Sequence, residues 1–268
     1  MCLPALKYYD LVVFIQSSRI KFSKKYVGEK VLLCTYGINT QYASSKSILN
    51  SNCNEIWNND KPHIIYGYVV VDPNCILTIN AGTNIYLHKN SGIIVGNPFS
   101  ASSGGTIKVN GTLGNEVTFR GDRLDSWYDS LPGQWDRIWL MPGSINNEFN
   151  YAIIKEGTIG IHADTVVNNS PTAIINNCII ENMSAIGILG QGANLQVNNS
   201  VVNNCGQYTV VCNIGGEYEF THCTFANFWN LNTRNTPSVL LSNYYEDLNG
   251  VIHCTEMNTG DSNYITPF

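Results

Sequence analysis

The densest group of side chains capable of chemistry lies between Gly121 and Ile138, in the stretch Gly-Asp-Arg-Leu-Asp-Ser-Trp-Tyr-Asp-Ser-Leu-Pro-Gly-Gln-Trp-Asp-Arg. Carboxylates and guanidinium groups hydrogen-bond hydroxyls, and an aromatic face covers the apolar C–H surface of a sugar ring. We therefore expect this stretch to contact carbohydrate. The candidate ligand-binding residues are Asp122, Arg123, Asp125, Trp127, Tyr128 and Trp135.

The acidic residues do not form the pairs that acid/base catalysis needs. Cleavage of a polysaccharide requires two convergent carboxyl groups, or carboxylates that hold calcium beside a base. The chain contains no Asp-Asp pair, and the acids of its regular part are far apart in sequence: Glu156, Asp164, Glu181 and Glu217. We predict no catalytic residue. A polysaccharide lyase or glycoside hydrolase remains the alternative.

The cysteines do not indicate a metal or redox site. There are nine, an odd number at irregular spacing, and no Cys-x-x-Cys occurs. That absence leaves a zinc or thioredoxin-like site without support. We therefore expect no metal and no cofactor, and we interpret Cys178 and Cys223 as small apolar residues that face inward.

A short repeat provides the frame for these side chains. From Phe149 to Phe225 a pattern of apolar, small and apolar residues returns at steps of 26, 22 and 23 residues. A period in the low twenties with strand-like spacing predicts a solenoid whose rungs bury their inner faces against one another. The copies are Phe149/Ala152/Ile154, Ile175/Cys178/Ile180, Val197/Ser200/Val202 and Phe220/Cys223/Phe225.

Asparagine recurs at fixed places in this repeat. Residues Asn182, Asn204 and Asn227 stand two positions after a copy. The position before the small inward residue is Asn177, Asn199, His222 and His253 in successive copies. Because stacked strands lie about 4.8 Å apart, we expect these last four side chains to form a hydrogen-bonded ladder along the stack.

Three segments follow from where the repeat begins and ends. Residues 1–58 do not follow it and are expected to form a small N-terminal β module, with short strands at Leu11–Ile15, Ile20–Phe22 and Val31–Leu33. Residues 61–258 are expected to form the solenoid, with about seven or eight rungs, and residues 259–268 a tail. The copy at Val251/Cys254 is irregular, because Glu256 stands at an inward position, and it is interpreted as a frayed end.

Composition and charge exclude several partners. Only 13% of the 268 residues are charged, and 44% are hydrophobic. A net charge of −5 without a basic stripe gives no reason to expect nucleic acid as a partner. No apolar run approaches the length of a membrane-spanning helix. The sequence does not determine the oligomeric state.

The order of several motifs resembles a group of bacterial right-handed parallel β-helix proteins. The motifs are Lys61-Pro62-His63-Ile64-Ile65-Tyr66, Leu77-Thr78-Ile79-Asn80-Ala81-Gly82-Thr83, Val117-Thr118-Phe119-Arg120-Gly121-Asp122-Arg123-Leu124 and Pro132-Gly133-Gln134-Trp135. Members of the group are mostly surface or periplasmic lipoproteins without an assigned activity. The resemblance implies export and an all-β, right-handed parallel β-helix, and it supplies no catalytic residues.

Together these features predict an exported, envelope-associated protein with a binding or scaffold role that contacts polysaccharide or a cell-surface glycan. Two alternatives stay open, the degradative enzyme named above and a purely structural spacer. The chain shows no leading signal, and we interpret it as a fragment of a longer exported chain; the alternative is a protein that is not exported.

Overall fold

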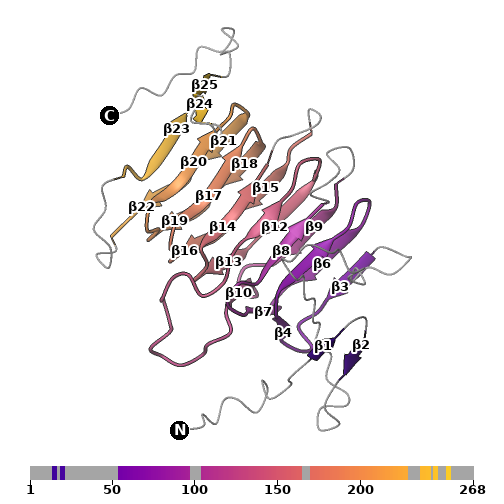
Figure 1. Ribbon diagram of the computed structural model, residues 1–268. Helices are drawn as coiled ribbons and strands as arrows, with labels where there is room; N and C mark the ends of the chain where they lie inside the picture. The colour runs from indigo at the N-terminus through magenta and orange to yellow at the C-terminus, as the bar shows by residue number, and fades with distance from the viewer. Residues whose placement is uncertain are drawn as a thin grey trace.

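The computed structural model describes residues 14–16, 19–21, 54–96, 104–164, 170–228, 236–242, 244–246 and 252–254. Within them the chain is built from short strands and contains no helix. Most of the strands belong to three parallel sheets of seven strands each. Consecutive strands visit the three sheets in turn, so that each set of three makes one rung of a right-handed parallel β-helix (Figure 1).

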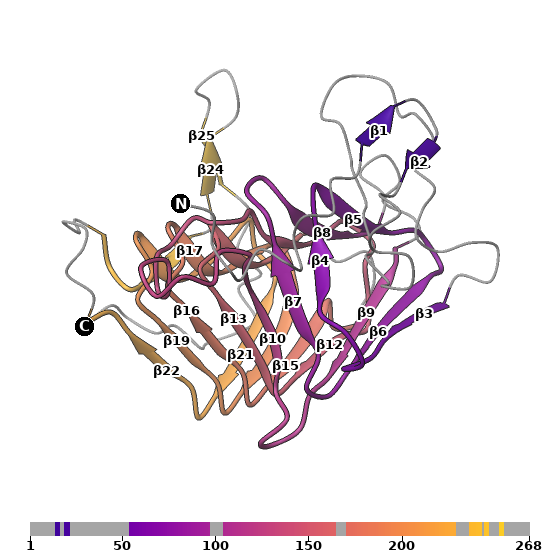
Figure 2. The ribbon, with the colours of Figure 1, turned by 90° about the horizontal axis from the view of Figure 1, so that it is seen from below.

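The three sheets form the sides of the coil (Figure 2). The first sheet contains β3 (Asn54–Trp57), β6 (Ile76–Asn80), β9 (Thr106–Asn110), β12 (Asn147–Asn150), β15 (Ala173–Asn176), β18 (Asn194–Asn198) and β21 (Glu217–Thr221). The second contains β4 (His63–Ile65), β7 (Asn84–Leu87), β10 (Val117–Gly121), β13 (Ala152–Lys155), β16 (Ile179–Glu181), β19 (Val201–Asn203) and β22 (Thr224–Ala226). The third contains β5 (Tyr68–Val71), β8 (Gly92–Val95), β11 (Ile138–Leu140), β14 (Ile159–Ala163), β17 (Ile186–Gln191), β20 (Tyr208–Asn213) and β23 (Val239–Ser242).

Two antiparallel strand pairs lie outside these sheets. β1 (Phe14–Gln16) pairs with β2 (Arg19–Lys21), close to two of the short strands expected near the N-terminus. The strand expected at Val31–Leu33 and the tail at 259–268 fall outside the described residues. β24 (Tyr244–Glu246) pairs with β25 (Ile252–Cys254) in antiparallel fashion, so Cys254 does not extend the parallel stack as the repeat suggested. The solenoid strands run from Asn54 to Ser242.

The repeat positions stack as their spacing predicts. Phe149 pairs with Ile175, then Val197 and Phe220 follow in the same column. Ile154, Ile180 and Val202 form a second column. The side chains of both columns point into the coil and are buried, apart from partly buried Phe220 in the last rung. Parallel pairing keeps identical positions above one another, so alternation along each strand buries the same face in every rung.

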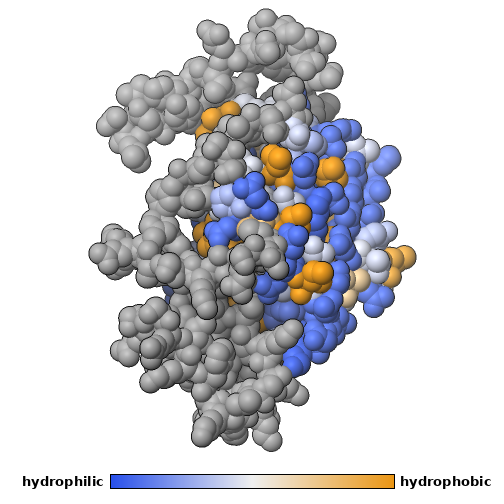
Figure 3. Space-filling model, turned by 90° about the vertical axis from the view of Figure 1, so that its right-hand side faces the viewer, coloured by the Kyte–Doolittle hydropathy of each residue, from blue (hydrophilic) through white to orange (hydrophobic). Residues whose placement is uncertain are grey.

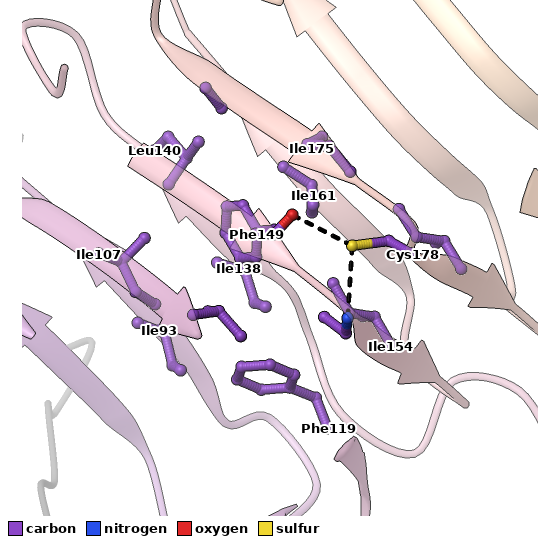
Figure 4. Close-up of a cluster of buried hydrophobic side chains, with 14 of the residues drawn as sticks. Ile93, Ile107, Phe119, Ile138, Leu140, Phe149, Ile154, Ile161, Ile175 and Cys178 are labelled. Atoms are coloured by element: carbon purple, nitrogen blue, oxygen red, sulfur yellow. Dashed lines mark hydrogen bonds between the residues drawn. The ribbon is translucent and has the colours of Figure 1, made fainter. Parts of the chain in front are cut away.

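The small inward residues fill the corner between the first two sheets. The Cys178 Sγ lies 3.4 Å from the Ala152 backbone N–H that donates to it, and 3.3 Å from the Phe149 carbonyl oxygen (Figure 4). The Ser200 Oγ accepts a hydrogen bond of 3.1 Å from the Cys178 backbone N–H. The prediction that Cys178 acts as a small buried residue is therefore confirmed.

The expected ladder runs one residue earlier than predicted. The Asn176 amide donates to Asn150 Oδ1 at 2.9 Å, and the Asn198 amide donates to Asn176 Oδ1 at 3.0 Å. Asn177 and Asn199 instead have positive φ values of 53° and 48°. They turn the chain between sheets, a conformation that asparagine tolerates better than most residues. The side chain of His253 lies outside the described set.

The turn between β10 and β11 is much longer than the corresponding turns of the next three rungs. The chain passes from the second sheet to the third through residues 156–158, 182–185 and 204–207 in three rungs, but through residues 122–137 between β10 and β11. This segment, the 122–137 loop, projects from the coil at the lower left of Figure 1. It contains every candidate ligand-binding residue predicted from the sequence.

Candidate functional site

The base of the 122–137 loop is held by a buried carboxylate from the next rung. Glu156, which is 0% exposed, follows β13. Its Oε2 accepts a hydrogen bond of 3.2 Å from the Gly121 N–H, and its Oε1 accepts one of 3.3 Å from the Ser130 N–H. One side chain thus holds the residue before the loop and a residue in its middle. The sequence analysis placed Glu156 among isolated acids, and the structure brings it to the loop.

Two cations balance the charge of this carboxylate. Arg120 Nη2 lies 3.4 Å from Glu156 Oε1, and Lys155 Nζ lies 3.4 Å from the same oxygen. Both cations also contact Asp129 of the loop, at 3.3 Å and 3.2 Å. The hydrogen bond and charge of Lys155 lower the pKa of the Asp129 carboxyl. Two acids and two bases therefore form a neutral group between the loop and the second sheet.

The end of the loop is a structural plug. Trp135 is 1% exposed, and its indole Nε1 donates to the Lys155 carbonyl at 2.8 Å. The ring lies directly above Gly157, where an added Cβ would be 2.9 Å from Trp135 Cε2. The expectation that Trp135 contacts a ligand conflicts with this burial, because the ring belongs to the core of the coil.

The rest of the loop is exposed or half-buried. Trp127 is 83% exposed, Leu124 and Leu131 are 41% and 39% exposed, and Asp125 and Tyr128 are half-buried. The Arg123 guanidinium carbon lies 4.8 Å from the centre of the Tyr128 ring, a cation–π contact that joins two candidate residues. The amide nitrogen of Gln134 donates to the carbonyls of Tyr128 and Leu131, each at 2.8 Å. These hydrogen bonds stabilise the middle of the loop.

Asp122 has a partner that the sequence analysis missed. Its Oδ2 lies 2.7 Å from Nδ1 of His88, which belongs to the turn one rung below. The His88 ring packs against Tyr66 of the first rung, with ring centres 4.5 Å apart. Burial and the charge of Asp122 raise the pKa of Tyr66. The signal for this contact is the rung register, since Leu87 pairs with Gly121 and the next residues are His88 and Asp122.

The groups left to meet a ligand are few. Asp129 and Asp136 are ion-paired, the latter with Arg137 at 3.0 Å, and Asp122 is hydrogen-bonded to His88. Asp125 has no hydrogen-bond or ionic partner for its side chain among the described residues. The His88 imidazole is 43% exposed; its Nδ1 contacts Asp122, and its Nε2 has no hydrogen-bond partner in the described part of the chain. The open set is His88, Arg123, Asp125, Trp127 and Tyr128.

A second polar cluster lies on the outer face of the third sheet. Arg137 Nη1 lies 3.3 Å from His162 Nδ1, and the Trp139 and His162 rings stack with centres 5.1 Å apart. Because an arginine only donates, Nδ1 is the acceptor and the His162 proton is on Nε2, which meets Gln191 Oε1 at 2.7 Å. Asp164 accepts from the Trp139 indole at 2.7 Å. The cluster satisfies its own polar groups, and its contacts join β11, β14 and β17.

Neither a metal site nor a spanning helix is found in the described ranges. They contain no group of three or more His, Cys, Asp or Glu residues that could hold a metal ion. They also contain no helix that is long and apolar enough to cross a membrane. Where the described residues are visible, the face on the right of Figure 1 is largely hydrophilic, with separate apolar spots (Figure 3). Comparison with family models, curated proteins and solved structures finds no match to this chain.

Proposed function

We propose that this chain is an exported β-helix protein that binds glycan through the 122–137 loop. The observation that carries the proposal is the 83% exposure of Trp127 on a loop whose base is anchored by a buried carboxylate. An exposed aromatic ring offers a flat apolar face to a ligand, and an anchored loop loses little entropy when a ligand binds.

The open groups suit a ligand with many hydroxyls. Trp127 offers a flat apolar face, and Tyr128 with Arg123 offers a second. Asp125 accepts hydrogen bonds from hydroxyl donors, and the exposed His88 ring offers Nε2 for a further hydrogen bond. Since water competes for each of these hydrogen bonds on a convex surface, we expect weak binding, roughly micromolar to millimolar.

Export is supported by two observations. The chain resembles bacterial β-helix proteins of the surface and periplasm in the motifs given above. In addition, Cys75 is disulfide-bonded, and disulfides persist mainly in oxidising compartments. The assignment to that lipoprotein group is part of the proposal.

The loop acids favour binding over catalysis, because most of them already have side-chain partners. A hydrolase of the two-carboxyl type needs two accessible acids a few ångströms apart. Of the four loop aspartates only Asp125 lacks a side-chain partner in the described ranges, and Glu156 has no exposed surface. The enzyme alternative therefore requires that a substrate displace existing ion pairs.

The test is glycan binding by the Trp127→Ala variant. The intact protein should bind a subset of glycans on an array, and titration calorimetry with those glycans should show binding that the variant loses. Phe228→Ala is the matched control, because Phe228 is 89% exposed but lies after β22 in the last rung. Retained binding by Trp127→Ala would place the site elsewhere. No binding by the intact protein would favour the spacer, and release of reducing ends from the same glycans would favour the enzyme.

A further inference from the structure

The residue that anchors the loop has an unfavourable backbone conformation. Glu156 has a φ of 70°, in the left-handed region. The equivalent residues of the next two rungs are Asn182 and Asn204, with φ values of 56° and 52°. Asparagine adopts this conformation readily, whereas glutamate does so at a cost. The turn itself therefore does not explain a glutamate at this position.

The contacts of the carboxylate explain it. Both backbone donors, Gly121 N–H and Ser130 N–H, lie at the start and in the middle of the 122–137 loop. An asparagine has a side chain shorter by one carbon and a single carbonyl oxygen, so it lacks both the reach and the second oxygen with which Glu156 meets the two donors. In the next rung, where the turn is short, Asn182 stands at this position. The glutamate coincides with the long loop.

We propose that Glu156 is the positioning residue of the ligand-binding loop. Its two oxygens close the segment 122–129 into a ring, so that Arg123, Asp125 and Trp127 are held in place before a ligand arrives. Without the carboxylate, this segment must be ordered at the moment of binding, and that entropy is subtracted from the affinity. The functional part of this inference rests on the proposed glycan-binding function.

The decisive variant is Glu156→Asn, which gives the turn the residue that the neighbouring rungs use and removes both the reach and the negative charge of the side chain. We expect amide hydrogen exchange in peptides covering 121–131 to speed up, and trypsin cleavage after Arg123 to become at least about tenfold faster, as loss of two charge-assisted hydrogen bonds implies. Exchange in β13 and β16 should stay unchanged. Glu156→Gln keeps the length and one acceptor oxygen, so it should be intermediate.

Asn182→Gln is the matched control, because it alters the same corner one rung on, where the turn of the preceding rung, residues 156–158, is short. It should leave exchange in 121–131 unchanged. Equal loop exchange in Glu156→Asn and the intact protein would overturn the proposal, and so would a loss of protection that includes β13 and β16.

These measurements need no ligand, so they are independent of the glycan array. If the intact protein binds arrayed glycans, Glu156→Asn should bind the same ones about tenfold more weakly. Unchanged affinity with a loosened loop would overturn the link to binding. If the intact protein binds none, the proposed function fails, and the exchange experiment still decides whether Glu156 positions the loop.

Discussion

Two tryptophans of the same loop have opposite environments. Trp135 lies in the core of the coil, where its indole N–H donates to the Lys155 carbonyl, while Trp127 projects into solvent. Both stand beside polar residues in the sequence, so their neighbours do not distinguish them. The structure distinguishes them, because Gly157 leaves room for the Trp135 ring.

This contrast predicts different costs for the same substitution. Trp135→Ala removes a large buried ring and leaves the Lys155 carbonyl without this donor, so it should lower the free energy of unfolding by about 3–5 kcal/mol. Trp127→Ala should change it by less than about 0.5 kcal/mol. Urea unfolding followed by circular dichroism measures both. Similar losses for the two variants would mean that Trp127 is also packed.

At the scale of the element, the corners between strands explain the asparagines of the repeat. Asn177 and Asn199 adopt positive φ between the first and second sheets, and Asn182 and Asn204 do so between the second and third. The side-chain ladder uses other asparagines, those at 150, 176 and 198, at the ends of the first-sheet strands. Asparagine is therefore frequent here for two separate reasons.

The backbone role can be tested at Asn199, whose side chain is exposed. Asn199→Gly should have almost no effect on stability, because glycine accepts positive φ. Asn199→Val should cost about 1–2 kcal/mol, because a β-branched residue is strained in the left-handed region. Thermal melts of the two variants provide the comparison. A larger loss for the glycine variant would mean that the asparagine side chain, rather than the turn, stabilises the corner.

At the scale of the whole molecule, the coil buries ionisable groups in one continuous core. Burial raises the pKa of the Cys178 thiol to about 12, and it raises that of the Cys212 thiol to about 12 as well. Both carry free thiols. Burial also raises the pKa of the Tyr218 hydroxyl. These groups therefore keep their protons in the folded chain at pH values where they lose them in the unfolded chain.

This arrangement predicts loss of stability in alkali. The unfolded thiols lose their protons above a pH of about 9, while the folded thiols keep theirs until about 12, so unfolding releases protons in between. The free energy of unfolding should be independent of these groups below pH 9 and fall as the pH rises toward 12. Urea titrations at several pH values measure the slope. The double variant Cys178→Ala/Cys212→Ala should show a smaller slope, and an equal slope would assign the effect to other groups.

The sequence alone was sufficient to predict the architecture of the coil. Apolar residues such as Phe149 and Ile154 alternate along each strand and return at a nearly constant period, and both properties are local to one rung. Parallel stacking then places each copy above the last, so the columns through Ile175 and Ile180 could be predicted from spacing. The loop was also visible, as an interruption of the period between Gly121 and Ile138.

Only the tertiary structure decided what the loop residues do. Asp122 meets His88 across 34 positions, and Ser130 meets Glu156 across 26. Such contacts depend on which turns lie above one another. Because the rungs around the loop differ in length, the repeat period does not predict this register. The burial of Trp135 depends on the space above Gly157, one rung away. Periodicity carries information about the faces of strands, whereas the partners of a long loop follow from three-dimensional packing between rungs.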